Sequence, residues 1–209
     1  DCGVCNGGNA DIDDCGVCFG GNADMDDCGV CNGGNADIDD CGVCFGDGSS
    51  CLASLSLGAF DSSGSLEVLY DFGGPVAGFQ FDITGLTITG ASDGAASDAG
   101  MTVSAGGATV LGFSFDNSEI SAGSGVLTVL SFSDVTADAT ELSLGNFGAV
   151  TDAAGNVYTT TVSGSIDHPS DCADVYYGDS WESDCGCVDA DNTGDDCDDC
   201  AGTPNGDAT

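Results

Sequence analysis

A thirteen-residue unit, repeated four times at the start of the chain, limits what that segment can fold into. Its copies read DCGVCNGGNADID, DCGVCFGGNADMD, DCGVCNGGNADID and the divergent DCGVCFGDGSSC. Each unit carries two cysteines, a glycine-rich turn and several carboxylates, but lacks the apolar stripe that a buried core requires. Strict repeats are typical of a quasi-linear array in which each unit depends on its neighbours. Something other than hydrophobic burial must therefore hold the array together.

The charge of the chain is entirely one-sided. It contains 36 acidic residues, one histidine and no lysine or arginine, which gives a formal net charge of −36. Nucleic acids and anionic membrane surfaces are bound through cationic side chains, so we expect neither as a partner. No apolar run is long enough to span a bilayer, and we expect no membrane insertion. A surface of this charge attracts cations.

All 14 cysteines lie in the two flanking segments, with none between Cys51 and Cys172. An even number in a framework of small residues indicates disulfides and an oxidising, extracellular compartment. Zinc is the alternative for the CxxC pairs, although zinc ribbons usually carry basic residues. Because the sequence begins inside a repeat, we expect a mature segment of a secreted precursor, released or held at the cell surface.

Two disulfide patterns fit the cysteine spacing. In a ladder, the second cysteine of one unit bonds the first cysteine of the next, mostly ten residues later. The ladder consists of Cys5–Cys15, Cys18–Cys28, Cys31–Cys41, Cys44–Cys51, Cys172–Cys185 and Cys187–Cys197, and it leaves Cys2 and Cys200 over at opposite ends. In the other pattern, bridges form inside each CxxC pair and Cys51–Cys172 clamps the middle segment.

Oxygen-bearing side chains recur at alternate positions of each unit, in the order Asn, Asp, Asp, followed at once by another Asp. Short glycine-containing loops bind calcium with ligands at positions 1, 3 and 5, and an all-oxygen set favours Ca²⁺ over transition metals. The sequence therefore predicts Ca²⁺ as a cofactor. The candidate ligands are Asn9, Asp11, Asp13, Asp14, Asn22, Asp24, Asp26, Asp27, Asn35, Asp37, Asp39, Asp40, Asp189, Asp191, Asp195, Asp196, Asn205, Asp207 and Asp1.

The two ends of the chain match as halves of one repeat. The last five residues followed by the first two read NGDATDC, which has the spacing of NADIDDC in residues 9–15. We therefore expect copies of the chain to join head to tail, as tandem modules or by assembly, with Cys200 of one copy bonded to Cys2 of the next. A heterologous contact of this kind builds a filament unless rotation closes it into a ring.

The middle segment, residues 52–168, alternates apolar and polar residues, which is typical of strands with one buried face. Turn signals such as Ser-Gly and Ala-Gly-Asn separate the strands. The expected strands are 66–72, 79–83, 86–89, 101–104, 110–115, 125–132, 141–144, 156–160 and 162–166, and no segment has a helical period. This pattern predicts an all-β jelly roll or β-sandwich, flanked by irregular Cys/Asp-rich repeats at residues 1–51 and 169–209.

Two family resemblances follow from these residues. The runs EVLYDFGGPVAGFQFDITGL, VLGFSFDNSEISAGSGVLTVLSFSDV and NVYTTTVSGSI resemble the cohesin-like modules of secreted bacterial surface proteins. That resemblance implies a sandwich that binds a partner, such as a dockerin, through one sheet face. The flanking repeats resemble the calcium-binding repeats of thrombospondin type 3 modules, which also combine DxD loops with cysteines.

No catalytic constellation is recognisable, and we expect no enzyme. The single histidine, His168, has no nucleophile elbow or oxyanion hole to work with and is interpreted as a linker residue. Tyr176, Tyr177 and Trp181 are expected to anchor the C-terminal flank against the sandwich or a neighbour, and the alternative is that they stack on a sugar. The sequence predicts a structural module of an extracellular fibre or surface appendage. The alternative is an adhesion module with a dockerin-like or glycan ligand, in which the repeats act as a rigid spacer.

Overall fold

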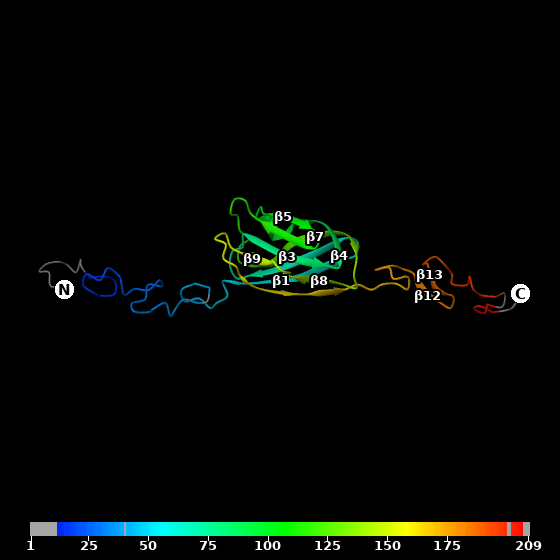
Figure 1. Cartoon of the computed structure of the whole chain (residues 1–209), viewed down its shortest axis with the longest axis horizontal. Coiled ribbons are helices and arrows are strands. Elements are labelled where there is room, and N and C mark those ends of the chain that lie inside the picture. Colours follow the sequence, from blue (N-terminus) through cyan, green and yellow to red (C-terminus); the bar gives the residue numbers. More distant parts are fainter. Residues whose placement is uncertain (1–11, 40, 200–201, 207–209) are drawn as a thin grey trace. The chain divides into compact units, whose positions relative to one another are not determined.

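The computed structural model describes residues 12–39, 41–199 and 202–206 (Figure 1). The chain forms two compact units, Asp1–Leu52 and Ala53–Thr209. The described part of the first unit contains no helix and, apart from the first residue of β1, no strand. Its chain folds back at three isolated antiparallel bridges, which are Ile12–Cys18, Met25–Cys31 and Ile38–Cys44. The N-terminal repeats are therefore irregular, as their composition predicts.

The second unit contains a β-sandwich whose first sheet has five strands, in the order β10-β1-β2-β7-β4. β1 and β2 form an antiparallel hairpin, and β7 pairs antiparallel with both β2 and β4. The bounds are Leu52–Asp61 for β1, Ser65–Phe72 for β2, Leu86–Ser92 for β4, Gly123–Val135 for β7 and Thr159–Ser163 for β10. The long β7 therefore joins the hairpin to the edge strand β4.

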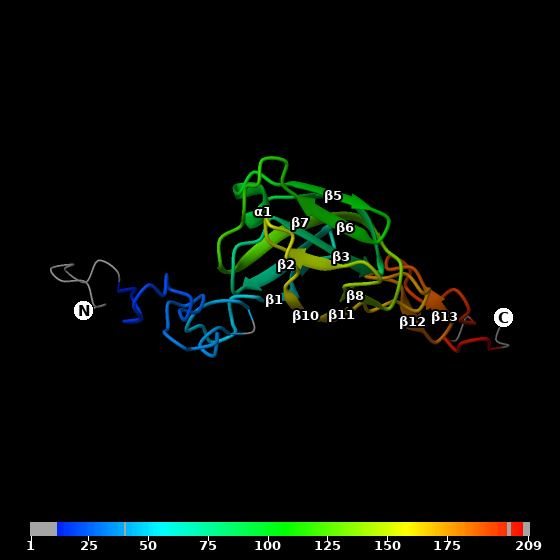
Figure 2. The ribbon, with the colours of Figure 1, turned by 60° about the vertical axis from the view of Figure 1, so that its left-hand side comes forward.

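The second sheet has the order β11-β8-β3-β6-β5 (Figure 2). In addition, β9 pairs with β3. All pairings in this sheet are antiparallel. The bounds are Gly78–Thr84 for β3, Thr102–Gly106 for β5, Thr109–Phe113 for β6, Ala139–Ser143 for β8, Ala149–Thr151 for β9 and Ser165–Asp167 for β11. The chain crosses repeatedly between the two sheets, as it does in jelly rolls.

The core of the sandwich is filled by alternate residues of the strands. Leu66 and Val68 of β2, and Phe81 and Ile83 of β3, are fully buried. Successive side chains of a strand point to opposite faces, so an alternating pattern buries one row and exposes the other. The prediction of an all-β sandwich flanked by disulfide-linked repeats is confirmed.

Some elements differ from the sequence-based expectation. The first strand, β1, is absent from the predicted set. Ala53, Leu55 and Leu57 alternate with serines, but a bulge between Leu57 and Phe60 breaks the alternation after a few residues. A helix, α1 at Gly94–Asp98, lies where none was expected. Asp93 has a φ of 56°, which turns the chain out of β4 and lets the helix bury Ala96. No helix in the described ranges is long and apolar enough to cross a membrane.

The C-terminal flank follows β11 and contains a small hairpin of β12 (Trp181–Ser183) and β13 (Gly186–Val188). His168, interpreted from sequence as a linker residue, is instead buried. Its Nε2 lies 2.7 Å from Oγ1 of Thr140, and its Nδ1 lies 2.7 Å from the hydroxyl of Tyr177. The expected anchoring of the flank by Tyr177 is confirmed, and His168 is the residue to which it is anchored.

Candidate functional site: aspartate-centred turns joined by disulfides

One aspartate organises each described turn of the N-terminal repeats. Oδ1 of Asp13 accepts backbone hydrogen bonds from Cys15 at 3.0 Å and Val17 at 2.8 Å. Oδ2 of the same residue accepts a third from the backbone N–H of Asn22, at 3.0 Å. The carboxylate thus serves backbone groups that have no helix or sheet partner. We call this arrangement an aspartate-centred turn.

The same turn recurs along the chain. The donors are again the second, fourth and ninth residues after the aspartate, at 2.8–3.0 Å for Asp26 and 2.8–2.9 Å for Asp39. In the C-terminal flank, Asp171 accepts from the same three positions at 2.9–3.1 Å. Asp199 accepts from the backbone of Thr203, four residues later, at 3.1 Å. Asp171 and Asp199 are absent from the residues predicted from sequence.

A glycine seven residues after each aspartate leaves room for the carboxylate. A β-carbon on this glycine would collide with Oδ2 of the aspartate of its own turn, and the glycines concerned are Gly20, Gly33, Gly46, Gly178 and Gly206. The preceding residue has a φ of 53–57° at each turn, and these residues are Phe19, Asn32, Phe45, Tyr177 and Asn205. The sequence signal of the turn is therefore an aspartate with valine or threonine four residues later and glycine seven residues later, and it would have located the two turns of the C-terminal flank.

Backbone N–H groups favour the charged form of three of these carboxylates. The pKa values of Asp26, Asp39 and Asp171 lie below the ordinary 3.8, mainly because of the hydrogen bond from the valine four residues later. Desolvation opposes this effect, and the other two backbone hydrogen bonds add to it. Hydrogen bonds to the ionised form lower the pKa of an acid, so the turn favours aspartate over its protonated form.

A side-chain pair closes the first two described turns. Oδ1 of Asn22 accepts a hydrogen bond from the backbone N–H of Asp14, and its Nδ2 donates to Oδ2 of Asp14, both at 2.9 Å. Asn35 and Asp27 make the same pair at the same distances. In the third turn Gly48 replaces the asparagine. The Asn and Asp side chains of each pair therefore satisfy each other.

Disulfides join each N-terminal unit to the next, with a pairing that differs from the predicted ladder. Cys15 bonds Cys31, and Cys28 bonds Cys44, each across a separation of 16 residues. The first cysteine of one unit thus bonds the second cysteine of the next, so both predicted pairings are wrong. Because each turn folds back on itself, cysteines close in sequence are not those whose Cα atoms come within 5.4 Å.

The remaining disulfides also depart from the ladder. Cys51 bonds Cys41 rather than Cys44, and in the C-terminal flank the bonds are Cys172–Cys187 and Cys185–Cys197. The last two loops overlap, as the N-terminal ones do. Cys18 is also disulfide-bonded. The cysteines outside the described residues are Cys2, Cys5 and Cys200.

No protein-family model matches the sequence, and no curated protein is similar to it. Solved structures similar to the chain are cohesin modules. A chain of a complex between the dockerin CaDoc0917 and the cohesin CaCohA2 is 17% identical, with 55% of this chain and 98% of that chain covered and a TM-score of 0.42. The non-cellulosomal cohesin of Archaeoglobus fulgidus is 15% identical, with 53% and 85% covered and a TM-score of 0.39. The sixth cohesin of scaffoldin B of Acetivibrio cellulolyticus, solved with the Cel5 dockerin, is 16% identical, with 55% and 97% covered and a TM-score of 0.42.

The described turns use many of the predicted calcium ligands for other contacts. Asp13, Asp26 and Asp39 each accept three backbone hydrogen bonds, and the Asn–Asp pairs satisfy each other. A hollow of about 530 Å³ is lined by Asp24, Asp26, Asp27, Asn32 and Asn35. Its oxygens suit a hard cation chemically. Of the carboxylates that line this hollow, Asp24 is the one whose side chain makes no hydrogen bond to the described residues.

In the described part of the C-terminal flank, the predicted carboxylate ligands form no close cluster of three. Asp196 accepts a hydrogen bond from Nδ2 of Asn192 at 2.8 Å. Among the described residues, one set of metal-binding side chains clusters closely, Cys185, Cys197 and Asp198, and the disulfide between its two cysteines removes their thiolates. The other predicted ligands Asn9, Asp11, Asp40, Asp207 and Asp1 lie outside the described residues.

Proposed function

We propose that the chain is a secreted structural module, in which disulfide-linked repeats carry the β-sandwich and join it to further copies of the same chain. The observation that supports this is the overlap of the disulfide loops. A pulling force that reaches Cys15 passes through the disulfide to Cys31, returns along the short CxxC segment to Cys28, and crosses to Cys44. Most of each aspartate-centred turn lies outside this covalent path, but the CxxC segment belongs to both, since Cys28 and Val30 donate to Asp26.

The overlap makes the repeats inextensible while they are oxidised. Sixteen unbridged residues could extend to about 50 Å, whereas the disulfide holds the Cα atoms of Cys15 and Cys31 at 5.4 Å. Single-molecule force spectroscopy of the full chain tests this. We expect no lengthening of the repeats before reduction. After reduction we expect about 30 Å of new length for each repeat unit, because thirteen residues replace a path of one disulfide and one CxxC segment. Lengthening of the repeats in the oxidised chain would contradict the proposal.

Head-to-tail joining of copies is the finer part of the proposal. The cross-link we expect between copies follows from the observed pairing. Cys15 and Cys28 each bond the cysteine 16 residues later, and the same separation would pair Cys2 with Cys18. We therefore propose that Cys200 of one copy bonds Cys5, rather than Cys2, of the next. Electron microscopy of the oxidised protein, with non-reducing mass spectrometry of the product, tests this. Fibres linked through Cys200 and Cys5 are expected, and discrete monomers would overturn it.

Calcium binding by the repeats stays a prediction. Because backbone N–H groups already stabilise the described carboxylates, we propose that calcium adds to the repeats without being needed to form their turns. Amide exchange of the oxidised chain with calcium and with a chelator separates the two roles. Protected turns in chelator are expected. Loss of that protection would show that calcium is an essential ligand, as the resemblance to thrombospondin type 3 repeats implies.

A second candidate function is an adhesion module that binds a dockerin-like or glycan partner through the sandwich. Leu111 of β6 is 40% exposed on the second sheet, paired with Gln80 of β3 and Ser104 of β5. An exposed leucine within a row of uncharged residues could contact a protein partner. We expect Leu111→Asp to weaken such binding in a pull-down with a dockerin, and unchanged capture would exclude this face.

A further inference from the structure

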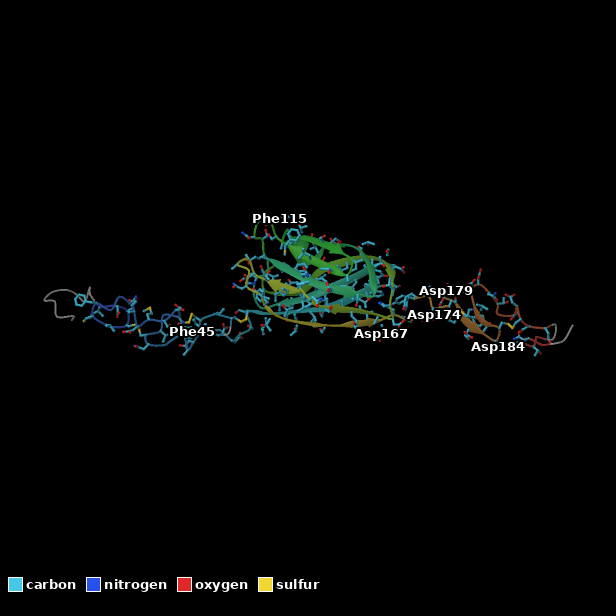
Figure 3. All side chains as sticks on the ribbon, in the orientation of Figure 1. Phe45, Phe115, Asp167, Asp174, Asp179 and Asp184 are labelled. Carbon is cyan, nitrogen blue, oxygen red and sulfur yellow. A yellow bond between two sulfur atoms is a disulfide. The ribbon has the colours of Figure 1, made fainter. Side chains whose placement is uncertain are left out.

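A hollow of about 410 Å³ opens where the C-terminal flank meets the sandwich, within the second unit. It is lined by the turn between β1 and β2, by the end of β7, and by the aspartate-centred turn of Asp171. Asp174, one of its lining residues, belongs to that turn at the start of the flank (Figure 3). The lining residues that matter below are Ser62, Phe132, Ser133, Asp134, Asp174 and Tyr177.

One wall of the hollow is an aromatic ring held in place from behind. Tyr177 is 40% exposed, and its hydroxyl is hydrogen-bonded to Nδ1 of the buried His168 at 2.7 Å. The rings of Tyr177 and Phe60 stack with centroids 5.8 Å apart, and Phe60 stacks on Phe132 at 5.3 Å. A ring fixed in this way loses little freedom when a ligand covers it, which lowers the entropic cost of binding.

The same turn is tied to the sandwich at a second point. The hydroxyl of Tyr176 donates a hydrogen bond to Oδ1 of Asp138, at 2.9 Å. The disulfide Cys172–Cys187 also closes the segment that carries Asp174 and Tyr177. The part of the hollow that the flank contributes is therefore already in place before a ligand binds.

The other walls are polar and unpartnered. Ser62, Ser133, Asp134 and Asp174 are exposed, and their side chains make no hydrogen bond to other described residues. The hollow carries two carboxylates and no cationic group, because the chain has no lysine or arginine. Coulomb repulsion therefore disfavours phosphates, sulfates and acidic sugars. Carboxylates and hydroxyls suit a ligand that is neutral and rich in hydroxyl donors.

We propose that this hollow binds a neutral carbohydrate. Hydroxyls of the sugar donate to Asp134 and Asp174, and an apolar face of the sugar ring packs on Tyr177. An aromatic face beside a few placed polar groups can hold and orient a small ligand. The inference names a ligand site for the second candidate function. The mechanical role of the repeats does not depend on it.

The test uses the full, oxidised chain and calorimetric titration with the methyl glycosides of glucose, galactose and mannose, and with glucuronate as the anionic comparison. We expect at least one methyl glycoside to bind, and glucuronate to bind more weakly. The variants Asp134→Asn and Asp174→Asn should each weaken binding about tenfold, because hydrogen bonds to a charged acceptor are stronger than those to an amide. Both side chains are exposed, so the melting temperature should stay unchanged.

A matched control is Asp98→Asn, which removes one exposed carboxylate from α1 and leaves the lining of the hollow intact. It should bind the sugar as the unmodified chain does. Absence of binding by all three glycosides, stronger binding of glucuronate, or full binding by both lining variants would overturn the proposal. Force spectroscopy of the same samples would still report on the repeats, so failure of the sugar site and failure of the structural proposal can be told apart.

Discussion

Gly33 packs against the carboxylate of Asp26, seven residues earlier, so closely that a β-carbon at residue 33 would collide with Oδ2. The change Gly33→Ala should therefore displace the carboxylate and release the backbone N–H groups of Val30 and Asn35. We expect hydrogen exchange of these two amides to accelerate about tenfold or more, since opening of the turn exposes them to solvent.

Gly106→Ala is the matched control for this change. Gly106 has no atom within 4 Å of the position of an added β-carbon and does not have a positive φ. Its substitution should leave exchange in the repeats unchanged. If the amides of Val30 and Asn35 stayed equally protected in Gly33→Ala, the carboxylate would not be what holds the turn.

Acid should open the aspartate-centred turns. The folded-state pKa values of Asp26, Asp39 and Asp171 are lowered by backbone hydrogen bonds. A lowered pKa means that the charged form is favoured on folding, so the stabilisation is complete above about pH 3.8 and is lost as pH falls through the lower folded values. Titration of the carboxyl carbons by NMR, compared with the reduced and denatured chain, checks this. Equal pKa values in the two states would contradict it.

The cysteine pairing predicts which thiol a single substitution releases. In Cys15→Ser, the unpaired thiol should be that of Cys31, sixteen residues later. Alkylation of the denatured, unreduced variant, followed by digestion and mass spectrometry, identifies it. Label on Cys5 would support the ladder, and label on Cys18 would support bridges within CxxC pairs. Trypsin has no site in this chain, so the digestion uses a protease that cleaves at aspartate.

Tyr177→Phe should loosen the C-terminal flank from the sandwich. The change keeps the ring that stacks on Phe60 but leaves Nδ1 of the buried His168 without its partner. We expect a loss of about 1 kcal/mol in the free energy of unfolding. Tyr70→Phe is the control, because its ring packs on Phe72 and its hydroxyl has no hydrogen-bond partner among the described residues. An equal loss in both variants would argue against the contact.

The same contact should weaken in mild acid. Burial lowers the pKa of His168 from its ordinary value of 6.5, and the charge of Asp167 partly opposes this. A lowered pKa in a base means that the neutral ring is favoured on folding. Its stabilisation is therefore present above about pH 6.5 and is lost as pH falls through the folded value. Denaturation of the unmodified chain and of His168→Gln between pH 7 and pH 5 measures the difference, which should vanish in the variant.

Periodicity identified the sandwich because its signal is local. Phe79, Phe81 and Ile83 alternate with polar residues, and alternation is enough to assign a strand with one buried face. The strand β1 was missed because its alternation covers few residues before the bulge between Leu57 and Phe60 interrupts it. Its place in the sheet depends on pairing with β2, which no local pattern reports.

The repeats show the opposite case. Their sequence alone determined that they lack a core, that cysteines cross-link them, and that carboxylates and glycines shape each unit. Two facts had to come from the folded chain. The first is that the carboxylate of Asp26 accepts hydrogen bonds from backbone N–H groups. The second is that Cys15 pairs with Cys31. Sequence shows which groups are present at which spacing, but a turn that folds back on itself decides which of them meet, since hydrogen bonds and disulfides form by distance in space.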